Sequence, residues 1–156
     1  MPNPIATLGV AAAIFIGGAG LVAAQDLERA VQARQSLMTL YGHYLGQLGA
    51  MAKGETPYDA AKAEAAATSL AGLATLDESA MWPEGSDNGA LGDKTRALPV
   101  IWTTYPAITE KMQAAADATA ALAKVAGTDL DSLRAGIGPV GKSCGDCHET
   151  YRAPKD

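Results

Sequence analysis

Two thiols and an imidazole stand close together near the end of the 156-residue chain, as Cys144, Cys147 and His148. The two cysteines are three residues apart, so on a helix they project to nearly the same side. In this C-x-x-C-H spacing each thiol can form a thioether with one vinyl group of a haem, and the adjacent imidazole can bind the iron. The motif therefore predicts one covalently attached haem c, with His148 as an axial ligand.

Three other uses of these residues are open to the sequence. A thioredoxin-like redox pair needs a βαβ setting, which the pattern does not show. A zinc site needs four ligands, and only the distant His43 could complete the set. A disulfide between Cys144 and Cys147 would leave His148 without a role. Haem attachment accounts for all three residues at once.

Composition limits the fold and the partners. The chain has 12 Lys+Arg against 17 Asp+Glu, a net charge of -5, so it lacks the basic surface that nucleic acid requires. It is 48% hydrophobic but only 5% aromatic, which favours helices over sheets. Its length indicates a single domain. No general acid–base pair or activated nucleophile is visible, so we do not expect an enzyme.

The N-terminus differs from the rest of the chain. Residues 1–24 contain no Asp, Glu, Lys, Arg or His, and the apolar run 5–24 ends in small residues. This pattern predicts a cleaved signal peptide over residues 1–24, leaving residues 25–156 as the haem domain. The run is also long enough to remain as an uncleaved membrane anchor, and it lacks the usual basic start. Either outcome predicts export to the periplasm.

Apolar residues recur in steps of three and four, which predicts helices packed as a bundle. In the first helix, from Leu27 to Lys53, this inward stripe comprises Leu27, Val31, Met38, Tyr41, Leu45 and Leu48, with Arg34 filling the remaining slot. A second helix is expected from a Thr56 cap to about Leu76, followed by a loop over residues 79–99 that Met81 and Trp82 could pin to the core.

A third helix is expected from the 104–107 region to Val125 and a fourth from a Thr128 cap through the cysteines. Pro139 should kink or interrupt the fourth helix. The predicted fold is all-α, an antiparallel four-helix bundle with haem attached near its C-terminal end.

Several separated segments, in this order, resemble the class II c-type cytochromes, meaning cytochrome c′ and low-spin relatives such as cytochrome c-556. They are residues 33–38, 53–55, 57–61, 94–97, 101–102 and 140–148, with Tyr151 and Arg152. The resemblance implies a haem inside the bundle, Arg152 near its proximal face, and Arg34 and Gln35 beside its propionates. The apolar stripe leads to the same expectation for Arg34, because a guanidinium on a buried face is costly unless it meets an anion. The alternative is that the long Arg34 side chain extends to water at the bundle end.

The resemblance makes Met38 the residue that decides function. A ligating Met38 gives a low-spin electron carrier that exchanges electrons with redox partner proteins, and this is the reading we expect. The alternative is a five-coordinate cytochrome c′ that binds NO or CO, with Met38 as a non-ligating distal residue that fills the core. His43 should face away from the stripe. The resemblance also implies a homodimer formed through the first two helices.

Overall fold

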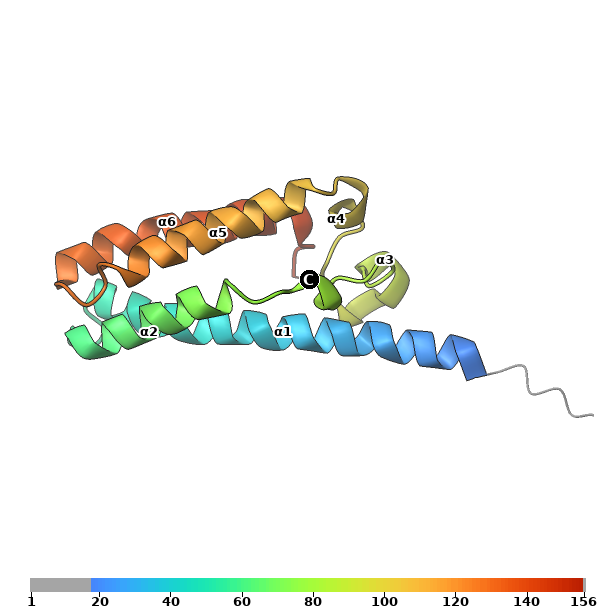
Figure 1. Cartoon of the computed structure of the whole chain (residues 1–156), viewed down its shortest axis with the longest axis horizontal. Helices are drawn as coiled ribbons and strands as arrows, with labels where there is room; N and C mark the ends of the chain where they lie inside the picture. The colour runs from blue at the N-terminus through green and yellow to red at the C-terminus, as the bar shows by residue number, and fades with distance from the viewer. Residues whose placement is uncertain (1–17, 156) are drawn as a thin grey trace, which may run out of the picture.

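The computed structural model describes residues 18–155, which form two layers of long helices (Figure 1). One layer holds α1 (Gly18–Lys53) and α2 (Ala60–Leu73), and the other holds α5 (Ala107–Ala123) and α6 (Leu130–Tyr151). Contacts run from α1 to α2, α2 to α5, α5 to α6 and α6 back to α1, so the four helices close into a ring. The predicted all-helical four-helix bundle is confirmed.

The starts of α2 and α6 differ from the predicted threonine caps. Asp59 caps α2 by accepting a hydrogen bond from the Lys62 N–H at 3.0 Å, and Asp129 caps α6 by accepting from the Ser132 N–H at 2.7 Å. A carboxylate accepts a stronger hydrogen bond than a hydroxyl and also interacts favourably with the positive end of the helix dipole. The Thr56 and Thr128 caps were therefore wrong by three residues and one residue.

The other helix boundaries follow the sequence more closely. Helix α1 ends at Lys53 as predicted but begins at Gly18, nine residues before Leu27, and α2 ends at Leu73. Helix α6 is not interrupted at Pro139. The proline and Ala135, whose carbonyl loses its helical partner, are both exposed, so water can satisfy that carbonyl.

Two apolar clusters make up the core. The larger one runs along the bundle, and small alanines on α2 allow α1 and α5 to approach it closely; its buried members are Leu48, Met51, Ala63, Ala66, Ala67, Leu70, Leu122, Ala126, Leu133 and Val140. The smaller one closes one end of the bundle, with Ala97, Ile101, Ile108 and Tyr151 buried and Trp82, Met112 and Cys147 packed against it. Trp82 thus anchors the connection to the core, as expected.

A long connection between α2 and α5 covers the end of the bundle. It contains four short helices, η1 (Ser79–Met81), α3 (Asn88–Leu91), η2 (Gly92–Lys94) and α4 (Val100–Thr103). Its main chain pairs with the end of α6. The Leu98 N–H donates to the Tyr151 carbonyl at 3.0 Å, and the Ala153 N–H donates to the Arg96 carbonyl at 2.8 Å. This pairing places the connection beside the cysteine–histidine motif.

The predicted export segment, residues 1–24, lies mostly outside the described residues. The part that is described, residues 18–24, forms the start of α1.

Over residues 18–155, no helix is both long enough and apolar enough to cross a membrane.

Leucines buried in the larger cluster should contribute most to the free energy of unfolding. Leu133→Ala is expected to lower the free energy of unfolding by about 2–5 kcal/mol, because Leu133 is fully buried and the substitution leaves a cavity. Leu76→Ala is the matched control, since Leu76 is 50% exposed, and it should change stability by no more than about 0.5 kcal/mol. Denaturant unfolding of both variants measures the difference, and equal losses would contradict this assignment of the core.

Candidate haem site

The thiols and the imidazole of the motif lie near the end of α6 and are half-buried. Cys144 packs against the larger apolar cluster and Cys147 against the smaller one, so the cysteine pair spans the boundary between them. Both thiols are free. Both cysteines therefore contact apolar side chains of the bundle, and no disulfide joins them.

The surroundings keep these three groups neutral. Burial raises the pKa of both thiols. Burial also lowers the pKa of His148, and the charges of Arg152 and Arg96 lower it further. A neutral imidazole keeps the lone pair that binds iron. Two neutral thiols, a neutral imidazole and apolar walls fit the covalent attachment and proximal ligation of a haem.

Two further residues face the cysteines from other elements. Tyr41 on α1 packs against the larger cluster, as Cys144 does, and burial, with the charge of Glu78, raises the pKa of Tyr41 to about 12. Glu78 precedes η1 and accepts a hydrogen bond from Trp82 Nε1 at 3.2 Å. The sequence placed Tyr41 only on the apolar stripe. It did not indicate Glu78, because no sequence pattern predicts that a carboxylate in a loop points inward.

Arg34 is 3% exposed and binds the loop, so its guanidinium does not reach water at the bundle end. Its Nη1 donates to the Met81 carbonyl at 3.1 Å and to Ser86 Oγ at 2.7 Å. Its Nη2 donates to the Ser86 carbonyl and to Thr95 Oγ1, the latter at 2.9 Å. The guanidinium also stacks on the Trp82 ring, 4.6 Å from its centroid. The acceptors are neutral oxygens, where an anion was expected.

The other residues expected near a haem lie close to this loop. Gln35 Nε2 donates to the Lys94 carbonyl at 2.8 Å. Arg152 is exposed, ends α6 and forms a bridge with Ala97. Arg152 is close enough to His148 for its charge to add to the effect of burial, and both lower the pKa of the imidazole.

Met38 is less central than the sequence stripe predicted. Its side chain is 40% exposed, whereas the preceding Leu37 is 4% exposed. Met38 therefore lies at the edge of the buried face of α1, about 60° around the helix from Tyr41. His43 is exposed and is 2.7 Å from Gln47, so it faces away as predicted.

The zinc alternative finds no assembled ligand set. Throughout the part of the chain that the structure describes, no three His, Cys, Asp or Glu side chains come together as a metal site.

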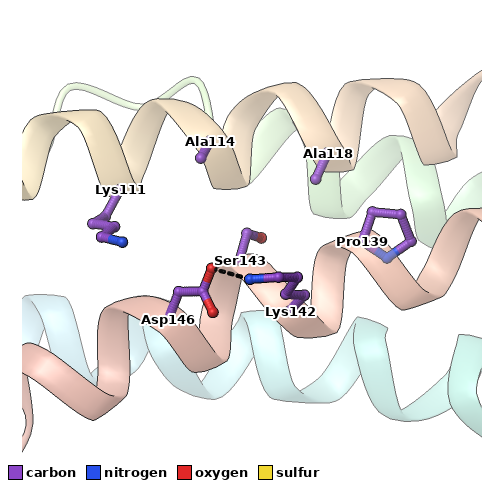
Figure 2. A pocket seen from close by; sticks show the side chains of 7 residues that line it. All are labelled: Lys111, Ala114, Ala118, Pro139, Lys142, Ser143 and Asp146. Atoms are coloured by element: carbon purple, nitrogen blue, oxygen red, sulfur yellow. Dashed lines mark hydrogen bonds and ion pairs between the residues drawn. The ribbon is translucent and has the colours of Figure 1, made fainter.

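A separate groove of about 280 Å³ lies between α5 and α6 (Figure 2). It is lined by Lys111, Ala114, Ala118, Pro139, Lys142, Ser143 and Asp146, and the Lys142 ammonium donates to the Asp146 carboxylate across one turn of α6. Neither the cysteines nor His148 line it. The groove is therefore distinct from the haem-attachment face of α6.

The contacts of Arg34 predict that it holds the loop in place. Arg34→Ala should lower the free energy of unfolding by about 2–3 kcal/mol, because it leaves buried acceptors unpaired. It should also speed hydrogen exchange at the Ser86 and Thr95 amides. Arg29→Ala, an exposed position on the same helix, is the control and should leave both measurements nearly unchanged. Unaltered exchange in Arg34→Ala would contradict the role.

Comparisons with known proteins agree with this geometry. The family described as Cytochrome C' matches residues 29–152. A cytochrome c-554 of Cereibacter sphaeroides is 44% identical over 129 residues, which is 83% of this chain and 84% of the relative. A solved cytochrome c' from Rhodobacter sphaeroides superposes with a TM-score of 0.80 at 36% identity, covering 83% of this chain and 98% of that one.

A second solved relative is a ferrous variant of cytochrome c prime from Alcaligenes xylosoxidans with bound NO. It has a TM-score of 0.70 and 38% identity, and the match covers 83% of this chain and 97% of that one. The cofactor is haem c, whose covalent attachment the two cysteines fit. The resemblance seen in the sequence is thus confirmed, and the chain belongs to the cytochrome c′ family of class II c-type cytochromes.

Proposed function

We propose that this chain is an exported haem protein that binds NO or CO on the distal side of a five-coordinate haem. Cys144 and Cys147 form the two thioethers, and His148 is the proximal ligand. The haem supplies a redox-active iron with one axial position open to a diatomic ligand. The protein binds its ligand and does not turn over a substrate.

The position of Met38 is the observation that supports an open distal side. Its side chain lies at the edge of the buried face of α1 and is 40% exposed, while Tyr41, one turn later, packs inward near Cys144. We propose that Met38 borders the ligand space without binding the iron. The NO complex of the Alcaligenes relative supports this choice over the electron carrier that the sequence favoured.

Electron transfer with Met38 as the sixth ligand is the second candidate. Met38 presents a thioether on the side of α1 next to Tyr41, and Met/His ligation raises the reduction potential and suits electron transfer. In this case the partners are redox proteins with basic patches that match the acidic surface.

We propose indirect roles for Arg34 and Gln35 at the haem propionates. Four N–H groups of Arg34 bind the loop, so the Nε–H is the donor left for a propionate, and Gln35 fixes the Lys94 main chain. Arg152 would stand at the proximal face. We further propose that residues 1–24 direct export to the periplasm and that two copies of the chain associate through α1 and α2.

Replacing the thiols tests the attachment. The double variant Cys144→Ser with Cys147→Ser should lose all haem that resists extraction into acidified organic solvent, because a serine hydroxyl cannot form the thioether that a cysteine thiol forms. Wild-type protein should keep its pigment through the same extraction, and release of that pigment would contradict the attachment.

The absorption spectrum of the reduced protein with and without CO tests the open distal side. A five-coordinate haem should give a high-spin spectrum that shifts promptly with CO, and Met38→Ala should leave the resting spectrum unchanged. A low-spin spectrum that ignores CO until Met38 is replaced by Ala would overturn this proposal in favour of electron transfer.

A further inference from the structure

Glu78 lies at the junction between α2 and the long connection, directly before η1. The turn there is fixed by Asp77, which accepts a hydrogen bond from the Ser79 N–H at 2.9 Å. Glu78 Oε2 accepts from Trp82 Nε1 at 3.2 Å, and Trp82 packs against the smaller apolar cluster. The carboxylate is therefore half-buried and held by a side chain anchored in the core.

The charge of Glu78 acts on both helices that border the site. Burial is the main cause of the raised pKa of Tyr41 on α1 and of Cys147 on α6, and the charge of Glu78 raises the pKa of both groups further. The cations that oppose it at Cys147 are Lys111 and Arg152. Trp82, which holds the Glu78 carboxylate, packs against the same smaller cluster as Cys147, so the negative charge lies on the side of the bundle where the haem is attached.

Glu78 makes no ion pair within residues 18–155, although six other carboxylates in this range each lie within 4 Å of a lysine or arginine. Arg34 stacks on the Trp82 ring, but its guanidinium donates its hydrogen bonds to the connection between α2 and α5. Burial accordingly raises the pKa of Glu78. A half-buried carboxylate of this kind is costly unless a positive charge comes near it.

An oxidised haem centre carries one more positive charge than a reduced one. We propose that the Glu78 carboxylate sets the reduction potential of the haem attached at Cys144 and Cys147, by stabilising the oxidised centre relative to the reduced one. This proposal rests on the haem attachment proposed above. Reduction by an external one-electron donor would remove that positive charge, and the Glu78 carboxylate would then bind a proton from the solvent more readily. Lower pH therefore favours reduction over the range in which Glu78 titrates.

Potentiometric titration of the haem-loaded protein tests this role. Glu78→Gln removes the charge but keeps an oxygen that can accept from Trp82 Nε1. It should shift the redox equilibrium toward the reduced form by roughly tenfold, the order expected when a half-buried charge acts through an effective dielectric of ~20. Glu84→Gln removes the same charge from an exposed position in the same connection and should shift the equilibrium by less than about twofold. Glu78→Asp keeps the charge and should remain close to wild type.

Reduced-minus-oxidised infrared difference spectra give a second readout. Wild type and Glu84→Gln should show the signal of a carboxyl group that gains a proton on reduction, and Glu78→Gln should lack it. Equal potential shifts in Glu78→Gln and Glu84→Gln, or a carboxyl signal that persists in Glu78→Gln, would overturn the proposal. Absence of covalent haem in wild type is a different result, because it contradicts the proposed attachment before any potential is measured.

Discussion

A single buried guanidinium organises the site end of this bundle. The connection between α2 and α5 is too long to hold a position by itself. Arg34 binds its middle through Met81, Ser86 and Thr95 and stacks on Trp82. Main-chain pairing with the end of α6 fixes the far side of the connection. The walls of the haem site therefore depend on α1 and α6 holding the same loop.

This interaction also shows how far the sequence predicts the site. The three-and-four spacing was sufficient to predict the bundle, and an arginine on an apolar stripe was sufficient to predict a buried partner. The loop oxygens that Arg34 binds were not predicted, and a propionate partner stays a prediction. Ser86 and Thr95 lie 52 and 61 residues from Arg34, and neither has a local pattern that links it to α1. Contacts of a loop with a helix carry no periodic signal.

The different burial of Leu37 and Met38 has a related cause. The predicted stripe treated α1 as a helix with one seam, whereas α1 contacts α2, α6 and the connection at η1. The buried face is accordingly shifted, so that Leu37 is buried and Met38 lies at its edge. The C-x-x-C-H motif needed no such information, because its chemistry is contained within five consecutive residues.

Charges of both signs act around the motif. Near His148 the charges that act are those of Arg152 and Arg96, which lower the pKa of the imidazole and oppose added positive charge. Near Tyr41 and Cys147 the carboxylate of Glu78 acts in the opposite direction. A haem iron bound by His148 would be stabilised in its oxidised form by the carboxylate and destabilised in that form by the two arginines. The net charge of -5 is spread over the chain from Asp26 onward, so it cannot substitute for this local balance.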